Sequence, residues 1–304
     1  MMTDSLRFVH ISDIHLPVEP GDCADIAALA NKRFFSCLSW VFKRRHLHRK
    51  AVTDRLISDF QNFHPEQIVV TGDLVNLSLP GEYARASAWL QGLGTPKQVM
   101  AIPGNHDLLV DTQASRQGLR LYGPYMGAKT KGGAPEFPYV KRVKDVAFIG
   151  LSTAVETPIG WCSGRLGETQ LAHLDSILEQ TGDQGLCRII TLHHPPAGYT
   201  KARGGLEDQD AFAAIIASRG AELILHGHSH RSSMIALPGP KGPVPVMGVA
   251  SASVAPGKGY EAACWHGYEV RRKREGWDIA LDVHRYTSAH AAPVLAAQAL
   301  LHSP

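Results

Sequence analysis

Residues 7–15 read RFVHISDIH, a short apolar run that ends in the polar residues Asp13 and His15. A buried strand is typically a short apolar run of this kind. Along the rest of the chain, strand-like runs alternate with helical runs. This alternation predicts an α/β fold with parallel strands. Further strand-like runs occupy residues 67–71, 98–102, 146–151, 188–192 and 222–225, and helical periodicity appears in residues 51–63, 82–93, 168–180 and 208–218.

The pattern changes after about His230. Residues 244–250 and 268–286 have the pattern of antiparallel strands, with a turn near Glu275 and Gly276, so we expect two mixed sheets. Residues 292–301 are expected to form a short terminal helix or a frayed tail. No shift in composition divides the chain. We therefore interpret residues 1–304 as one domain, with an insertion at residues 31–50 and a C-terminal tail at residues 288–304.

The composition narrows the class of protein. Of the 304 residues, 44% are hydrophobic and 19% charged, which excludes a disulfide-dependent miniprotein and a disordered chain. Lysine and arginine number 31 against 28 acidic residues, an excess too small to predict a nucleic-acid partner. The five cysteines are scattered without a CxxC pair. With no evident signal peptide or spanning segment, we expect a cytoplasmic protein with reduced thiols.

Five polar clusters follow five of the predicted strands. In open α/β sheets, ligands bind at the carboxyl ends of the strands. We therefore expect these clusters to converge on one site. They are Asp13 with His15, Gly72 with Asp73, the run from Gly104 through Asn105 and His106 to Asp107, His193 with His194, and Gly227 with His228 and His230.

The spacing and residue types of these clusters indicate a metal centre. Residues at i and i+2 of an extended segment point to the same side, so Asp13 with His15, and His228 with His230, can each grip one ion. Carboxylates, imidazoles and amide oxygens are ligands of manganese, iron, zinc or nickel. The absence of cysteine from the clusters argues against a thiolate zinc site. Seven candidate ligands suit two ions about 3.5–4 Å apart that share a carboxylate, the arrangement used in phosphoryl hydrolysis.

The ordered motifs DxH, GD, GNHD, HxP and GHxH span residues 13–230 and resemble those of the calcineurin-like metallophosphoesterase family. The resemblance implies a four-layer αββα sandwich of two mixed β-sheets, with a dinuclear metal site at the carboxyl ends of the strands. It also implies two divalent or transition metal ions, such as manganese, iron or zinc. One ion would be held by Asp13, His15 and His230, the other by Asn105, His193 and His228, and Asp73 would bridge them.

The resemblance assigns catalytic roles to two further residues. His106 is expected to donate a hydrogen bond or proton to the substrate phosphate or leaving group, and Asp107 to orient His106. The implied enzyme is a hydrolase acting on phosphoric ester bonds. It is expected to be a phosphodiesterase that breaks a P–O bond of a small-molecule phosphoester by attack of metal-bound hydroxide. A phosphodiesterase for cyclic nucleotides is included, because that branch of the family uses the GNHD histidine on a leaving alkoxide.

Two other functions stay open at this stage. One is an enzyme like UDP-2,3-diacylglucosamine pyrophosphohydrolase of lipid A synthesis. A major branch of enzymes with that activity has a motif resembling GNRD, with arginine where this sequence has His106. The other is a non-catalytic scaffold with the metallophosphoesterase fold. Degenerate members lose metal ligands or the histidine of GNHD, and here none of them is missing.

Residues 31–50 form a basic and aromatic segment with seven lysine or arginine residues and no acidic residue. The plain interpretation is a helix with its apolar face on the core and its basic face in water. The alternative is an interfacial element that contacts anionic lipid, or binds an acyl or nucleotide substrate, at a membrane surface. The loop at residues 198–205 is a second candidate for contact with the substrate. The sequence leaves the natural substrate and the oligomeric state open.

Overall fold

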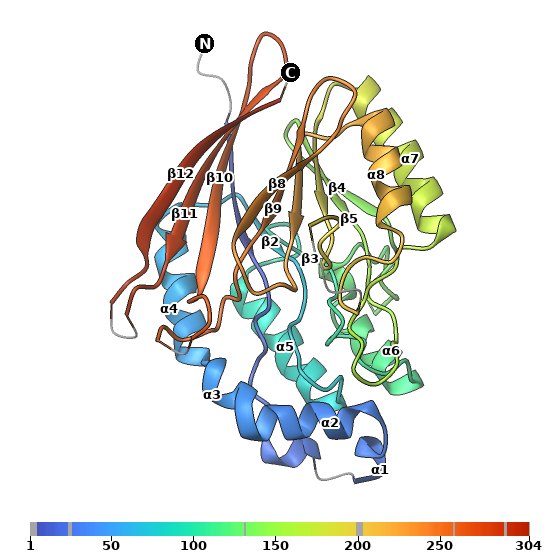
Figure 1. Cartoon of the computed structure of the whole chain (residues 1–304), viewed down its shortest axis with the longest axis vertical. Coiled ribbons are helices and arrows are strands. Elements are labelled where there is room, and N and C mark those ends of the chain that lie inside the picture. The colour runs from blue at the N-terminus through green and yellow to red at the C-terminus, as the bar shows by residue number, and fades with distance from the viewer. Residues whose placement is uncertain are drawn as a thin grey trace.

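A computed structural model describes residues 5–23, 26–130, 132–198, 203–257, 259–288 and 291–303. Its strands form two six-stranded sheets (Figure 1). The first sheet has the order β12-β11-β10-β1-β2-β3 and consists of β1 (Leu6–Ile11), β2 (Gln67–Val70), β3 (Val99–Ala101), β10 (Cys264–Arg272), β11 (Trp277–Arg285) and β12 (Val294–Ser303). The second has the order β4-β5-β6-β7-β9-β8 and consists of β4 (Tyr139–Val143), β5 (Val146–Gly150), β6 (Cys187–Thr191), β7 (Leu223–His226), β8 (Ser233–Leu237) and β9 (Val244–Gly248).

Both sheets are mixed, as predicted. Strands β1, β2 and β3 are parallel, and β10, β11 and β12 extend that sheet with antiparallel pairing. Strands β5, β6, β7 and β9 are parallel, with β4 and β8 as antiparallel edges. The four predicted helices are α4 (Lys50–Gln61), α5 (Pro80–Leu93), α7 (Glu168–Asp183) and α8 (Gln209–Arg219). The structure also contains α6 (Gln113–Arg120) and the short η3 (Gly123–Tyr125).

The space between the two sheets is filled by buried aliphatic side chains with a few aromatic ones among them. Phe8 of β1 stacks on Tyr268 of β10 with ring centroids 4.6 Å apart. It also meets Phe148 of β5, in the other sheet, edge-on at 5.2 Å. Burial of each such side chain stabilises the fold by about 1.5–3 kcal/mol. Phe8 therefore packs the two sheets against each other, and it lies in the same strand, β1, whose carboxyl end leads to Asp13.

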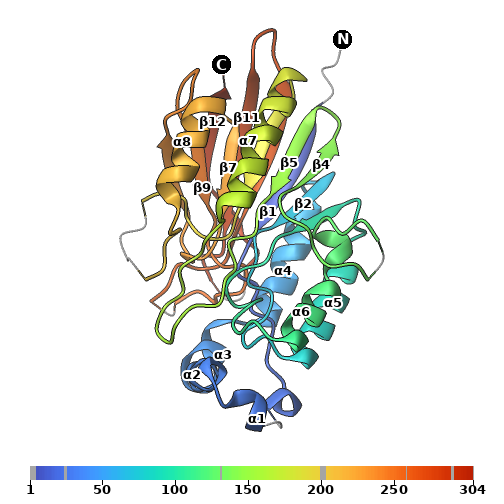
Figure 2. The ribbon, with the colours of Figure 1, turned by 90° about the vertical axis from the view of Figure 1, so that its right-hand side faces the viewer.

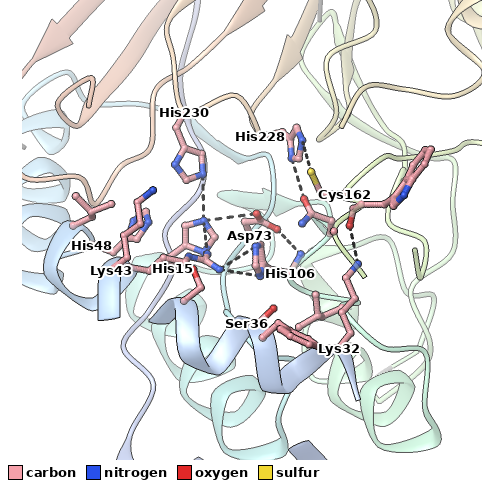
Figure 3. Close-up of a pocket in the computed structure, with 18 of the residues that line it drawn as sticks. His15, Lys32, Ser36, Lys43, His48, Asp73, His106, Cys162, His228 and His230 are labelled. Atoms are coloured by element: carbon pink, nitrogen blue, oxygen red, sulfur yellow. Dashed lines mark hydrogen bonds and ion pairs between the residues drawn. The ribbon is translucent and has the colours of Figure 1, made fainter. Parts of the chain in front are cut away.

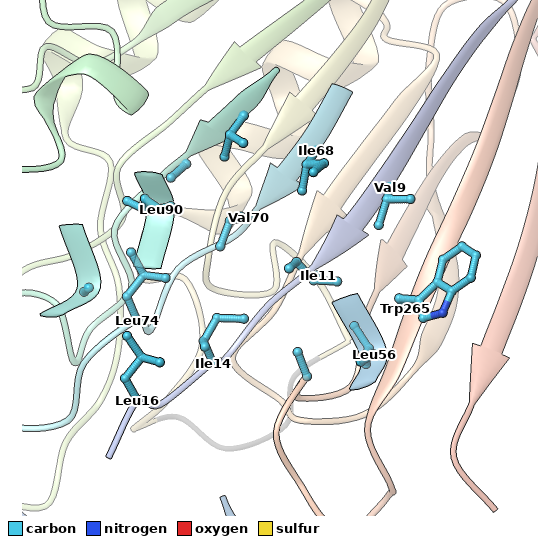
Figure 4. Packing of buried hydrophobic residues seen from close by; sticks show 14 of the residues in the cluster. Val9, Ile11, Ile14, Leu16, Leu56, Ile68, Val70, Leu74, Leu90 and Trp265 are labelled. Carbon is cyan, nitrogen blue, oxygen red and sulfur yellow. The ribbon is translucent and has the colours of Figure 1, made fainter. Parts of the chain in front are cut away.

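The outer faces of the sheets are covered by helices. Successive residues of a strand point to opposite faces, so Val9 and Ile11 leave the inner core and pack with Leu56 of α4 (Figure 4). On the second sheet, Ile190 packs in one cluster with residues of α7 and α8. Figure 1 shows α7 and α8 on the right-hand side of the sheets and α4 on the left-hand side. The predicted αββα order is confirmed.

The C-terminal segment differs from the prediction. A terminal helix or frayed tail at residues 292–301 is wrong, because β12 pairs antiparallel with β11 as the edge strand. Alanine and leucine favour a helix in isolation, but the free edge of β11 offers backbone partners. Leu301 also packs into the core between the sheets. Tertiary pairing therefore overrides local propensity here.

Strand β9 also departs from the expected antiparallel pairing. Residues 244–248 pair parallel with β7 and antiparallel with β8. Strand β8 is not predicted from the sequence. Its alternating half-buried and exposed residues are those of an edge strand that carries a weak apolar signal. The predicted hairpin that follows is confirmed as β10 and β11.

The segment at residues 31–50 crosses the end of the molecule where β1 terminates (Figures 1 and 2). Trp40 is buried, but other apolar side chains of the segment are exposed, so only part of its apolar surface faces the core. Among the described residues, no helix has the length and apolar character needed to cross a membrane. The elements at this end are η1 (Pro20–Cys23), α1 (Ile26–Leu29), α2 (Lys32–Ser39), the π-helical turn η2 (Trp40–Arg44) and α3 (Arg45–Leu47).

Candidate metal centre and active-site cavity

Backbone strain is concentrated where the polar clusters meet. Among the described residues, eight other than glycine have positive φ, and five of these are predicted metal ligands. Left-handed backbone brings Cβ too close to the following carbonyl oxygen and costs about 1–2 kcal/mol per residue. Such strain typically collects at functional sites. The five φ angles are 54° for Asp13, 46° for His15, 56° for Asp73, 63° for His228 and 52° for His230.

The first predicted ligand set comes together closely. Ligand atoms of Asp13, His15, Asp73 and His230 all lie within 4.8 Å of one another. Asp13 Oδ1 lies 3.0 Å from His230 Nε2, and the Nε2 atoms of His15 and His230 are 3.3 Å apart. Asp13 Oδ1 is buried and accepts no hydrogen bond from a described residue. These lone pairs converge on one point, which is the geometry that a bound cation needs.

The second predicted set meets at Asn105. The Oδ1 atom of Asn105 lies 3.2 Å from His193 Nε2 and 3.0 Å from His228 Nδ1. His193 Nε2 is also 3.5 Å from Asp73 Oδ2. On the other side, the same Oδ2 atom lies 3.7 Å from His15 Nε2. Asp73 therefore stands between the two sets, where a bridging carboxylate is expected.

Backbone groups fix the orientation of these side chains. Asp73 Oδ1 accepts a hydrogen bond of 2.8 Å from the His106 amide, which leaves Oδ2 to face the histidines. The Nδ1 atom of His193 lies 2.6 Å from the Thr71 carbonyl oxygen, and that of His15 lies 3.2 Å from the Val75 carbonyl oxygen. A ring N–H that donates to a backbone carbonyl holds the other nitrogen toward a metal.

Charge in the site is shared between Asp73 and His193. Burial alone would raise the pKa of Asp73, but His193 and His106 lower it well below its usual range. At His193 burial lowers the pKa, yet the Asp73 carboxylate outweighs it and raises the pKa to about 9. Metal ligands must be deprotonated, so a divalent ion bound beside Asp73 would replace the His193 proton. The carboxylate, imidazole and amide donors fit such ions.

The adjacent histidine is held differently. The ring nitrogens of His194 lie 2.7 Å from Thr153 Oγ1 and 3.0 Å from the Cys162 carbonyl oxygen. Both nitrogens therefore have partners outside the cluster. His193 is the member of this pair whose Nε2 faces Asp73.

His106 lies beside the two ligand sets, but Asp107 does not touch its ring. The Nδ1 atom of His106 lies 2.7 Å from the Asn76 carbonyl oxygen, to which the ring N–H donates. The Asp107 carboxylate instead accepts hydrogen bonds from four backbone amides, those of Asp73, Leu74, Val75 and Gly104. The expectation that Asp107 directly orients His106 therefore needs correction, because backbone donors occupy both carboxylate oxygens. Asp107 ties together the two loops that carry Asp73 and Asn105.

Arg44 of η2 enters this site, which the sequence analysis does not predict. Its Nη2 atom lies 2.7 and 3.2 Å from the two ring nitrogens of His15. Its Nη1 atom lies 3.3 and 3.1 Å from those of His106. The guanidinium thus bridges His15, an expected metal ligand, and His106, the expected proton donor. The sequence signal for this role is weak, because Arg44 stands in a run of basic residues that all suit a solvated helix face.

His48 is a second residue that the motifs do not include. A nitrogen of its ring lies within 4.8 Å of ligand atoms of both His15 and His230, so these three residues could also hold an ion. Its Nδ1 atom lies 2.8 Å from Ser253 Oγ. His48 follows Arg44 by one helical turn, so both reach the site from the same segment.

A cavity of about 440 Å³ lies over the two ligand sets (Figure 3). Helix α2 and the turn η2 form one wall, and residues 159–162 form another. Tyr260 also lines the cavity. In the loop at residues 198–205, Tyr199 and Lys201 lie outside the described residues. The Arg203 guanidinium lies 5.5 Å from the ring centroid of Trp161, so this loop reaches the cavity wall.

The calcineurin-like phosphoesterase family model matches residues 6–232. The chain belongs to this family. It is therefore a hydrolase that acts on phosphoric ester bonds, and its Asp/His cluster matches the family's use of divalent metal ions.

Individual relatives agree with this assignment. A probable cyclic nucleotide phosphodiesterase from Synechococcus sp. is 29% identical over 237 residues, which cover 75% of this chain and 74% of the relative. A glycerophosphodiester phosphodiesterase from Enterobacter lignolyticus is 31% identical over 132 residues, or 43% of this chain and 42% of that protein. A dimetal phosphatase from Danio rerio shares the fold, with a TM-score of 0.59, 14% identity and 98% coverage of both chains.

Proposed function

We propose that this phosphoesterase is a dinuclear metal-dependent phosphodiesterase. The observation that carries the proposal is the position of Asp73 Oδ2, which lies 3.7 Å from His15 Nε2 and 3.5 Å from His193 Nε2. One carboxylate oxygen thus faces both ligand sets, as a shared ligand of two ions must. The names of the relatives, cyclic nucleotide and glycerophosphodiester phosphodiesterases, favour diester substrates.

The proposal assigns the seven ligands to two ions. Asp13, His15 and His230 would hold one ion, Asn105, His193 and His228 the other, and Asp73 would be shared. When bound, the two ions supply Lewis acidity to the phosphoryl group and a nucleophile at neutral pH. His228 lies on one side of the cavity and His15 and His230 on the other (Figure 3), and Asn105 Oδ1 is 3.0 Å from His228 Nδ1. A phosphoryl group held between the two sides would contact both sets.

His106 is the proposed proton donor to the leaving oxygen. Its Nδ1–H is held by the Asn76 carbonyl, so the proton that reaches the leaving group must be carried on Nε2. Asp107 contributes through the backbone, since it fixes the loops that carry Asp73 and Asn105. Loss of a general acid usually slows a reaction about 10²–10⁴-fold.

The test compares bis-p-nitrophenyl phosphate with p-nitrophenyl phosphate, each with Mn²⁺ and with a chelator. We expect metal-dependent cleavage of the diester and about two ions per chain. His106→Ala should keep the ions and lose turnover. The control His173→Ala removes an exposed histidine on α7 and should leave turnover unchanged. A chain that binds no ions and cleaves neither ester would refute the proposed function.

The exposed apolar surface of α2 and η2 favours a second candidate, a pyrophosphohydrolase of the UDP-2,3-diacylglucosamine type. Phe34, Phe35, Leu38 and Phe42 are 50%, 54%, 39% and 76% exposed. Ile159, 59% exposed, and Phe35 also line the cavity. An acylated substrate would place its chains on this surface and its phosphates in the cavity. The exposed Arg45, Arg49 and Lys50 of the segment would face anionic lipid, with the enzyme cytoplasmic and peripheral at the membrane.

Co-sedimentation with vesicles that contain anionic phospholipid tests the membrane contact. The triple variant Phe34→Ser, Leu38→Ser and Phe42→Ser should reduce binding at least about fivefold. Met234→Ser, which removes an exposed methionine from β8, is the matched control and should bind like the native protein. Hydrolysis of UDP-2,3-diacylglucosamine by the native protein is the accompanying assay. Equal sedimentation of the triple variant and the native protein would remove the support for this candidate.

A further inference from the structure

The cavity over the ligand sets has an unbalanced charge. Among the described residues that line it, Lys32, Lys43 and Arg44 are cationic and Asp73 is the one carboxylate. The proposed ions would occupy that carboxylate. The remaining charges of the cavity wall are therefore positive, and all three come from the segment at residues 31–50.

Arg44 makes no direct contact with a described carboxylate. Its described contacts are the imidazoles of His15 and His106, and it forms no ion pair with a described Asp or Glu. A guanidinium 3.2 Å from His15 Nε2 and a cation on that nitrogen repel each other. A phosphoryl group attracts both and can lie between them. Arginine is also suited to this task, because its planar fork donates two parallel hydrogen bonds to phosphate oxygens.

The two lysines flank this position. Lys32 donates hydrogen bonds to neutral oxygens, Thr157 Oγ1 and the Trp161 carbonyl oxygen at 2.9 Å. The Nζ atom of Lys43 lies 5.3 Å from the ring centroid of Tyr260. Figure 3 shows Lys32 on the Cys162 side of the cavity and Lys43 on the His48 side, with His15, Asp73 and His106 between them. Neither lysine forms an ion pair with a described carboxylate.

We infer that Arg44, Lys32 and Lys43 form an anion subsite for a substrate that carries a second acidic group beside the scissile phosphoryl group. Arg44 binds the scissile group, and one flanking lysine, Lys32 on the Cys162 side or Lys43 on the His48 side, binds the second phosphate or carboxylate. The inference rests on the proposed function, because the phosphoryl group at Arg44 is the one that is hydrolysed. It narrows the substrate to compounds with two acidic groups, such as nucleoside diphosphates or phosphodiesters that carry a second acid.

Two inhibitors that differ by one acidic group test the subsite. Propylphosphonate carries one phosphonate, and propane-1,3-bisphosphonate carries a second on the same chain. Inhibition constants against bis-p-nitrophenyl phosphate and calorimetric binding constants are measured on the Mn²⁺-loaded protein. The variants are Arg44→Gln, Arg44→Lys, Lys32→Gln and Lys43→Gln. Arg45→Gln, which removes the same charge from the neighbouring exposed side chain, is the control, and metal content is measured for each protein.

The native protein should bind the bisphosphonate at least about tenfold more tightly than the monophosphonate. Arg44→Gln should weaken both by at least about tenfold with the metal content unchanged, and Arg44→Lys should restore part of the binding. Lys32→Gln or Lys43→Gln should reduce the preference for the bisphosphonate at least about threefold and leave the monophosphonate unaffected.

Equal binding of the two inhibitors by an active, metal-loaded native protein would overturn the subsite and leave the proposed function intact. Unchanged binding in Arg44→Gln would overturn the role of Arg44. A native protein without metal and without diesterase activity would instead refute the proposed function itself. If Arg44→Gln does not fold, the comparison of Arg44→Lys with Arg45→Gln decides the role of Arg44.

Discussion

Asp107→Asn probes the carboxylate that joins the two metal-carrying loops. Asp107 Oδ2 accepts the amides of Asp73 at 2.8 Å and Gly104 at 2.9 Å. Its Oδ1 accepts those of Leu74 at 3.0 Å and Val75 at 3.3 Å. Asparagine has the same shape but offers one acceptor oxygen. In either orientation of the side chain, its NH₂ group faces two backbone N–H groups and cannot accept a hydrogen bond from them.

The expected cost follows from these lost acceptors. A buried donor left without a partner costs about 1–3 kcal/mol, and Asp107 is fully buried. Two such donors give about 2–6 kcal/mol, a large part of the stability of an ordinary domain. One of the hydrogen bonds that can be lost is the one from the Asp73 amide. Because this bond helps to position the shared ligand Asp73, the variant should also bind metal more weakly.

Urea unfolding followed by circular dichroism, together with metal analysis of the folded protein, measures both effects. Asp54→Asn is the control, since Asp54 forms an exposed ion pair with Lys50 on α4 and should cost less than about 1 kcal/mol. If Asp107→Asn kept native stability and metal content but lost turnover, the assigned backbone role would be wrong. The carboxylate would then act on His106 itself.

Three further predictions follow from other parts of the structure. Asp73→Asn should lower the bound metal from about two ions per chain to less than one, as counted by elemental analysis. Gly72→Ala should destabilise by more than about 3 kcal/mol in urea, because the φ of Gly72 is 100° and the added Cβ would lie 2.5 Å from the Gly104 nitrogen. Gly160→Ala, with positive φ but open space around it, should cost only about 1–2 kcal/mol. Burial lowers the pKa of Lys141 to about 8, below its unfolded value, so the unfolded chain binds more protons between the two pKa values. The native protein should therefore gain about 1–2 kcal/mol over Lys141→Met from pH 8 to pH 10.5, with the linkage value discounted for partial exposure, and a flat difference across that range would contradict this assignment.

Much of this fold can be predicted from local patterns in the sequence. The strand at residues 6–11 and the helices α4, α5, α7 and α8 have strong periodicity and lie close to their predicted ranges. Strand β12 has no such signal, because its alanines and leucines fit a helix equally well. Its structure depends on the free edge of β11, a partner that only the assembled sheet provides.

The candidate site divides in the same way. The DxH, GNHD and GHxH spacings place Asp13, Asn105 and His228 at strand ends, and the structure brings them together. Arg44 and the contacts of Asp107 cannot be predicted from spacing. Arg44 reaches the site because a helical segment folds across the strand ends, and Asp107 meets backbone amides that carry no sequence signal.

The ligand sets draw on both sheets, and this has a consequence for assembly of the chain. The amide of His228 donates to Asp13 Oδ2 at 3.0 Å across 215 positions of sequence. During synthesis, the site cannot close until about the first 230 residues have emerged and the two sheets have docked. Ions that bind only the closed site stabilise correctly folded molecules and do not stabilise molecules whose sheets are misdocked. Metal supply during translation should therefore govern the yield of folded protein more strongly than the same supply after folding.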